Sequence, residues 1–209
     1  LTVFVAILLG CPTALLPLQI LWVNLVTDVL PAMALIRDPA DDEVMRRPPR
    51  DPAEALVTGR FGLRVLVEGA LLAAGVLSAY LWVVWSEGAG AVANTMAFTA
   101  LVLIHPLQAM NCRSTKLNWW QLPPNPWVPS SLVVLLGLQW LAIEYGPLAR
   151  LLGTAPLGSA HWLGLAVGVL WPVGALEIWK AWGRLITGAS APRRGHRRLG
   201  PHAGTQPRP

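Results

Sequence analysis

The sequence predicts an all-α protein, a polytopic transmembrane helix bundle with five full spans and a partial helix at its amino-terminal end. Two observations support this fold class. Of the 209 residues, 54% are hydrophobic and only 13% are charged, which is too apolar for an ordinary soluble domain. The apolar residues also gather in runs of about 20, the length that a helix needs to cross the hydrocarbon core of a bilayer.

Five runs have the length and composition of a membrane-spanning helix. We predict spans at residues 16–36, 61–85, 91–112, 129–145 and 161–182. The opening run, LTVFVAILLG, is too short to cross a membrane alone. No basic stretch precedes it and no small-residue cleavage site follows it, so it does not fit a signal peptide. We interpret it as the last half of a helix, and the chain as a fragment.

Helix-breaking residues separate these runs. Proline-rich segments follow the first and third spans, and we expect polar loops there because proline interrupts a helix. On the other side of the membrane, we expect short loops at SEGAGA and GPLARLLGTAPLGSA. A GxxxG pattern, GLAVG at residues 164–168, lies in the last span, and we interpret it as packing within the chain rather than as a dimer interface.

The positions of the 16 Lys and Arg residues predict the orientation, because cytoplasmic flanks retain positive charge. Six lie between residues 37 and 64, two lie in CRSTK, and seven lie from Lys180 onward, which leaves Arg150 alone on the opposite side. The sequence therefore predicts a multi-pass protein of the cell membrane with a cytoplasmic carboxyl terminus. We divide it into a membrane domain, residues 1–183, and a basic, disordered cytoplasmic tail, residues 184–209.

The net charge of +5 is compatible with nucleic acid binding, but the excess lies in loops and a tail beside the membrane. Attraction to anionic lipid explains it more simply, so we expect membrane lipid and no nucleic acid as a partner. Cys11 and Cys112 fall near opposite faces of the membrane and lack the spacing of a metal site, so we expect no disulfide between them.

Polar groups in the first full span indicate where the chemistry lies. Asn24, Thr27 and Asp28 stand at i, i+3 and i+4, which places three oxygen-bearing side chains on one face of an α-helix. A carboxylate at this depth is costly unless it binds or relays something. Hard cations take such oxygen ligands, and Pro31 can free backbone carbonyls to join them. The alternative is a cluster of hydrogen bonds between helices.

The segment LLPLQILWVNLVTDVLPAMAL, followed by EVMRRPPR, resembles the sixth transmembrane helix and following loop of P-type cation-transporting ATPases, especially the calcium-pump-like group. FTALVLIHPLQAMNCRS resembles the eighth helix of that family, and GTAPLGSAHWLGLAVGVLWPVGALEIWK resembles the tenth. By this resemblance, Asn24, Thr27 and Asp28 fall on metal-coordinating positions. The transported substrate is then Ca²⁺ or another hard cation.

The resemblance also implies what the chain needs from elsewhere. In such pumps ATP phosphorylates an aspartate in a cytoplasmic domain, and the resulting domain movement alternates access to the membrane site. These 209 residues contain no DKTGT sequence and no nucleotide or actuator domain. We therefore expect no catalytic or cofactor-binding residue here and no activity of the chain alone. Its expected partners are amino-terminal pump domains, in the same or another chain, with Mg-ATP acting only in the complete pump.

Two residues depart from the pattern of the family. Val29 stands where calcium pumps commonly have glycine, which stiffens the backbone beside Asp28. His105 stands where some calcium pumps place an acidic ligand, and a neutral imidazole is a poor ligand for a hard cation. This argues against a two-calcium stoichiometry. His105 can instead serve as a proton carrier or a tethered charge, and the alternative is a packing histidine beside Pro106.

Two other functions compete with the pump. One is a free-standing accessory protein or a non-functional fragment of a split pump gene, but half a helix leaves its end unsatisfied in lipid. The other is a channel, which a single carboxylate cluster without repeats supports poorly. The sequence therefore favours the carboxyl-terminal membrane part of an ATP-driven cation transporter.

Overall fold

The computed structural model describes residues 2–8, 15–38, 59–113 and 124–187. Within them the chain is helical, and five helices are long and apolar enough to cross a membrane. These spans are Pro17–Ile36, Phe61–Glu87, Ala91–Cys112, Trp127–Glu144 and Ser159–Trp182. The predicted fold class is confirmed, and each predicted span lies within two residues of an observed one at its start and its end.

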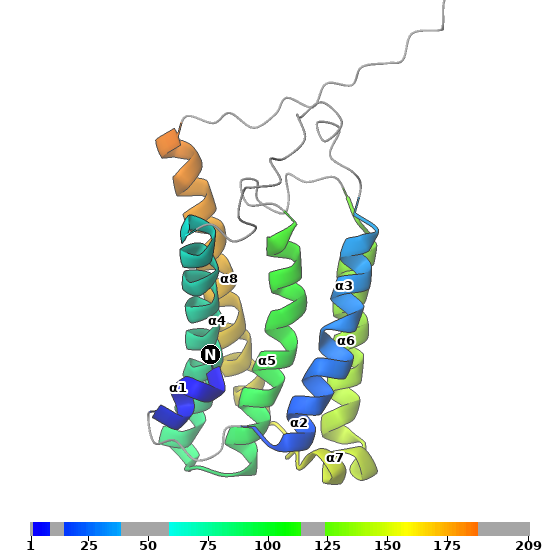
Figure 1. The fold of residues 1–209 in the computed structure, drawn as a ribbon. Helices are drawn as coiled ribbons and strands as arrows, with labels where there is room; N and C mark the ends of the chain where they lie inside the picture. Colours follow the sequence, from blue (N-terminus) through cyan, green and yellow to red (C-terminus); the bar gives the residue numbers. More distant parts are fainter. Residues whose placement is uncertain (1, 9–14, 39–58, 114–123, 188–209) are drawn as a thin grey trace, which may run out of the picture.

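The elements follow one another as an up-and-down bundle (Figure 1). In chain order they are α1 Thr2–Leu8, α2 Pro17–Trp22, the π-helix η1 Val23–Thr27, α3 Val29–Ile36, α4 Gly59–Glu87, α5 Ala91–Cys112, α6 Trp127–Glu144, α7 Gly146–Leu152 and α8 Ser159–Thr187. We call the end where α3 and α5 terminate the upper end, and the end where α7 lies the lower end (Figure 1).

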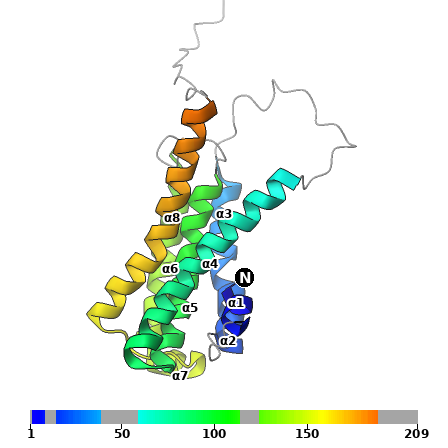
Figure 2. The same cartoon turned by 90° about the vertical axis from the view of Figure 1, so that its left-hand side faces the viewer.

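Helix α5 lies between two groups of helices, as the two views at right angles show (Figures 1 and 2). On one side it packs against α4 and α8, which also pack against each other. On the other side it contacts α6, α3 and η1, and α3 packs against α6. Because both groups cover it, α5 contains the most buried membrane span of the five.

Glycines allow α4 and α8 to approach closely. A Cβ atom added at Gly75 would lie 2.5 Å from the carbonyl oxygen of Gly168, and one added at Gly168 would lie 2.8 Å from the Cβ of Ala79. A Cβ at Gly164 would lie 2.4 Å from the ring of Trp82. The GLAVG run therefore packs within the chain, as predicted, because only glycine leaves room for the facing helix.

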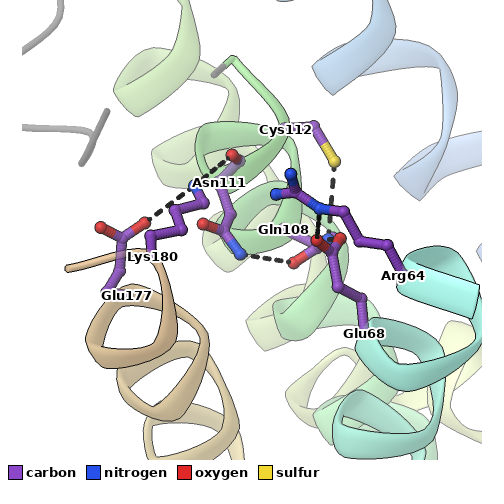
Figure 3. A network of polar contacts seen from close by, with 7 residues as sticks. All are labelled: Arg64, Glu68, Gln108, Asn111, Cys112, Glu177 and Lys180. Atoms are coloured by element: carbon purple, nitrogen blue, oxygen red, sulfur yellow. Dashed lines mark hydrogen bonds and ion pairs between the residues drawn. The ribbon is translucent and has the colours of Figure 1, made fainter. Parts of the chain in front are cut away.

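Polar side chains tie α4, α5 and α8 together at the upper end (Figure 3). On the α4 side, Arg64 Nε lies 2.6 Å from Glu68 Oε1, and Gln108 of α5 donates from Nε2 to Glu68 Oε2 over 3.1 Å. The first contact is an i, i+4 ion pair within α4, and the second is a hydrogen bond between two helices.

The same network continues to α8. Asn111 donates from Nδ2 to Gln108 Oε1 over 3.2 Å, and its own backbone carbonyl accepts a 2.6 Å bond from Lys180 Nζ. Lys180 also lies 3.2 Å from Glu177 Oε1, and both side chains are almost completely buried. Lys180 thus satisfies a carbonyl in the last turn of α5, which has no partner within its own helix.

Three local features differ from the prediction. The expected lower loop contains a short helix, α7, which ends at Gly153 in the left-handed conformation with φ 64° that favours glycine. Helix α6 begins at Trp127, ahead of Pro129, because proline is tolerated in a first helical turn. Helix α8 continues to Thr187, past the predicted boundary at residue 183. Cys11 and residues 188–209 lie outside the described residues, and the Cys112 thiol is free.

Candidate cation site

The span that carries Asn24 and Asp28 is not a continuous α-helix. It begins as α2 with Pro17 in the first turn, where the missing amide hydrogen is not needed. It then widens into the π-helix η1 and resumes as α3 after Asp28. Pro31 has no N–H group for the carbonyl of Thr27, so the α-helical ladder is interrupted beside Asp28. Short π-helical segments inside longer helices are frequent at functional sites.

A buried glutamine holds the lower end of this span. Gln19 is completely buried, accepts a 3.0 Å bond from the Leu16 amide through Oε1, and donates from Nε2 to the carbonyl of Leu152 over 3.0 Å. The first bond satisfies an amide at the start of α2, and the second joins α2 to the end of α7. Gln19 thereby fixes the segment that leads into η1.

The three predicted ligands do not share one face. Asn24 is exposed, and the side chain of Asp28 is 54% exposed, so both lie on the open side of the span. Thr27 is completely buried and donates its hydroxyl hydrogen to the carbonyl of Val23. The prediction of a common face is wrong for Thr27. A π-turn holds more residues than an α-turn, so it rotates Thr27 inward and keeps Asp28 one turn above Asn24, toward the upper end.

His105 of α5 is an ionisable side chain that lies close to Asp28. Its Nδ1 lies 2.6 Å from the carbonyl oxygen of Leu101, and because a carbonyl only accepts, Nδ1 must donate. Its Nε2 then lies 3.8 Å from Asp28 Oδ1. The imidazole is therefore bonded to its own helix, as a packing histidine would be, and also faces the carboxylate across the interface between α5 and η1.

Asp28 and Asn24 offer a carboxylate and an amide oxygen to a ligand on the open side. The described residues contain no group of three or more His, Cys, Asp or Glu side chains placed to hold a metal ion. Hard cations of the calcium type take six to eight oxygen ligands. Within the described part of the chain, Asp28 and Asn24 would therefore supply only one side of a coordination shell and not a closed cage.

The chain also matches a known protein family. The family described as "Cation transporting ATPase, C-terminus" matches residues 12–182. The chain belongs to this family. It is 35% identical over 166 residues to the "Calcium-transporting ATPase" of Bacillus subtilis (strain 168), with 78% of this chain and 18% of that protein covered. It is 32% identical over 190 residues to the "Calcium-transporting ATPase 3, endoplasmic reticulum-type" of Arabidopsis thaliana, with 77% of this chain and 19% of that protein covered.

The match fixes the place of the chain within a cation-transporting ATPase. It runs from residue 12 to Trp182 and covers all five membrane spans. The chain spans about a fifth of the length of the curated relatives it matches. It is thus the carboxyl-terminal membrane part of a P-type cation pump, and the alternative of a free-standing accessory protein is not favoured.

Three polar residues that join helix ends, Gln19, Asp38 and Asn125, were not singled out from the sequence. Gln19 stands in an apolar run like Asn24, but its partner Leu152 lies 133 residues away and nothing in the sequence points to it. Asp38 and Asn125 fall in proline-rich stretches that we interpreted as plain loops. The available signal was a polar residue within a few positions of a predicted span end, where helices meet.

Proposed function

We propose that this chain supplies part of the intramembrane ion site of an ATP-driven calcium pump. The observation that carries the proposal is the exposed carboxylate of Asp28 on an apolar membrane span. Such a group costs about 2.5–3.5 kcal/mol at the centre of a membrane helix, so it faces a protein interior, water or an ion rather than lipid. The relatives named as calcium-transporting ATPases support calcium as the cation.

Asp28 and Asn24 are the proposed first ligands because both are accessible from the open side. Thr27 is the third proposed ligand. Its hydroxyl proton is used by Val23, but the hydroxyl oxygen retains lone pairs and the carbonyl of Thr27 has no donor at Pro31. In this arrangement Asp28 supplies the negative charge and the other two supply neutral oxygens.

His105 has a separate proposed role beside this site. With Nδ1 bonded to Leu101, only Nε2 can interact with Asp28. Imidazole nitrogen suits softer metals better than calcium, so His105 is not assigned as a calcium ligand. A proton on Nε2 would make the ring a tethered positive charge, which competes with a cation for Asp28.

The remaining parts of the proposal concern orientation and partners. We place the upper end in the cytoplasm because the described basic residues at span ends, Arg37, Arg64, Arg113 and Lys180, lie there, whereas Arg150 lies on α7. The cell membrane is the proposed location, and lipid the surrounding partner.

The phosphorylation and nucleotide-binding domains that use Mg-ATP are the proposed protein partner, upstream in the same chain or in another, and no nucleic acid is involved. Residues 1–183 form the proposed membrane domain and residues 184–209 the tail.

Two experiments test this function. An antibody to residues 192–209 should detect a native membrane band several times heavier than 22.5 kDa. A band near 22.5 kDa would mean that any upstream domains belong to a separate chain. The assembled pump should hydrolyse ATP in response to Ca²⁺, and Asp28→Ala should abolish that response. A Ca²⁺ response that survives Asp28→Ala would overturn the ligand assignment.

A further inference from the structure

Three nitrogen donors converge on one oxygen atom of Asp38, just beyond the end of α3. Arg113, after the last residue of α5, approaches Asp38 Oδ1 with Nη2 at 2.7 Å and Nε at 2.9 Å. Asn125, ahead of α6, donates from Nδ2 to the same oxygen over 3.0 Å. We call Asp38, Arg113 and Asn125 the upper junction. It joins the ends of three different helices, because Arg113 and Asn125 follow Asp38 by 75 and 87 residues in the sequence.

Asn125 uses its other polar atoms in the same place. Its Nδ2 also donates to the carbonyl of Ala34 in the last turn of α3 over 3.1 Å, and its Oδ1 accepts a 3.0 Å bond from the amide of Trp127 at the start of α6. It therefore satisfies one carbonyl and one amide that helix ends leave without partners. Arg37 adds a second contact, with its guanidinium carbon 4.0 Å from the centre of the Trp127 ring.

Local helix stability does not explain these residues. A negative charge at the carboxyl-terminal end of α3 is unfavourable for the helix dipole. The side chain of Arg113 is only 7% exposed, so its charge has left water and requires its partner. Removing one member of such a pair is expected to disturb the junction because the other charge is left buried. The pairing is therefore explained by the contact between helices.

The upper junction and the candidate cation site lie on the same two helical segments. Asp38 follows Asp28 by ten residues, about 15 Å along a helix, and Arg113 follows His105 by eight residues, about 12 Å. Asp28 faces His105, and Asp38 pairs with Arg113. The span that carries Asp28 thus contacts α5 at two levels. Helix α3 links Asp28 to Asp38 on one side, and the last two turns of α5 link His105 to Arg113 on the other.

We propose that Asp38 and Arg113 are positioning residues that set the separation of α3 and α5 and so hold Asp28 opposite His105. The inference rests on the proposed role of Asp28 as a cation ligand. Neither residue is one of the proposed ligands. Helix α3 has only eight residues and follows a π-helical segment, so it is the partner able to shift when the junction is broken. Helix α5 is held on its other side by α4 and α8.

The test uses the complete pump with Asp38→Asn, Arg113→Gln and the double variant. We expect each single change to raise the Ca²⁺ concentration for half-maximal ATPase activity about 3- to 10-fold, with the maximal rate retained, as for residues that act on a site from a distance. The half-saturating Ca²⁺ concentration of the double variant should be no higher than that of the more affected single variant, because the two residues act as one unit. Arg150→Gln, which changes an exposed arginine on α7, is the matched control.

A shift in half-saturation at constant maximal rate is the decisive result, because loss of folded protein lowers the maximal rate instead. Unchanged half-saturation in all three variants would overturn the proposal. If Arg113→Gln is not produced in the membrane, Arg113→Lys keeps the charge but loses the two-nitrogen contact, and should shift half-saturation by less. Asp28→Ala is measured in parallel. If Asp28→Ala abolishes the Ca²⁺ response while the Asp38 and Arg113 variants behave normally, only the positioning role is wrong. If Asp28→Ala also has no effect, the ligand assignment is wrong as well.

Discussion

Two regions of the bundle place their polar side chains in opposite ways: the group of α4, α5 and α8, and the span formed by α2, η1 and α3. In the first, glycines bring helices together and the polar side chains are turned inward and paired (Figure 3). In the second, a carboxylate and an amide lie on the open side, and an interrupted helix carries them. Of the most apolar part of each span, 56% is buried in α5 but only 28% in Pro17–Ile36. The described chain thus separates a packed scaffold from an interrupted span whose polar groups lie on an open side.

The comparison predicts that scaffold variants act on stability and site variants act on cation affinity. The largest effect on stability is expected for Lys180→Met, which removes the bond to the Asn111 carbonyl and the buried ion pair with Glu177. Breaking a buried ion pair from one side typically costs about 3–5 kcal/mol. The thermal midpoint of the purified protein in detergent should fall by several degrees. Lys180→Arg keeps the charge, so its thermal midpoint should fall less. An unchanged midpoint for Lys180→Met would contradict the scaffold role.

A smaller loss is expected when the glycine packing is disturbed. Gly75→Ala places a methyl group 2.5 Å from the backbone oxygen of Gly168, so α4 and α8 must separate. Overpacking of this kind typically costs about 1–3 kcal/mol. Gly137→Ala is the matched control, because a Cβ at this exposed glycine of α6 meets nothing within 4 Å. Equal thermal midpoints for the two alanine variants would show that the close approach of α4 and α8 is not needed.

Thr27 separates a structural from a ligand role within the site. Thr27→Val keeps the buried shape but loses the bond to Val23, which is expected to reduce stability by about 1 kcal/mol. If Thr27 also binds the cation, the half-saturating Ca²⁺ concentration should rise in the same variant. Thr27→Ser retains the hydroxyl and should keep the affinity. A Thr27→Val pump with normal Ca²⁺ affinity would remove Thr27 from the ligand set.

The smallest effect is expected at His105. If the ring acts as a tethered charge, His105→Gln should raise Ca²⁺ affinity about 5-fold, since two unit charges near 4 Å interact by about 1 kcal/mol in water. The measurement is the Ca²⁺ dependence of ATPase activity in the His105→Gln pump beside that of the unchanged pump. A fall in affinity would instead make His105 a ligand.

Hydropathy predicted the spans well because each depends on residues next to one another in the chain. The span 91–112 was predicted to the residue, since Gly90 and Arg113 mark its ends. The inward rotation of Thr27 was not predicted, because an α-helical period was assumed across η1. The upper junction was not predicted either, because Asp38 and Arg113 are 75 residues apart and only the folded bundle brings them together. The local hydropathy pattern thus predicts where each helix begins and ends, whereas the contacts between helix ends depend on how the helices pack.

The central claim is that Asp28 binds the transported cation, and equilibrium Ca²⁺ binding to the assembled pump tests it most directly. Asp28→Asn keeps the size of the side chain and removes its charge, and Glu144→Gln makes the same change at an exposed residue near the lower end of α6. We predict that Asp28→Asn weakens Ca²⁺ binding by more than about 10-fold, because even residues that only support a ligand contribute 10- to 100-fold. Glu144→Gln should bind Ca²⁺ normally. Equal Ca²⁺ affinity of the two variants would contradict the account.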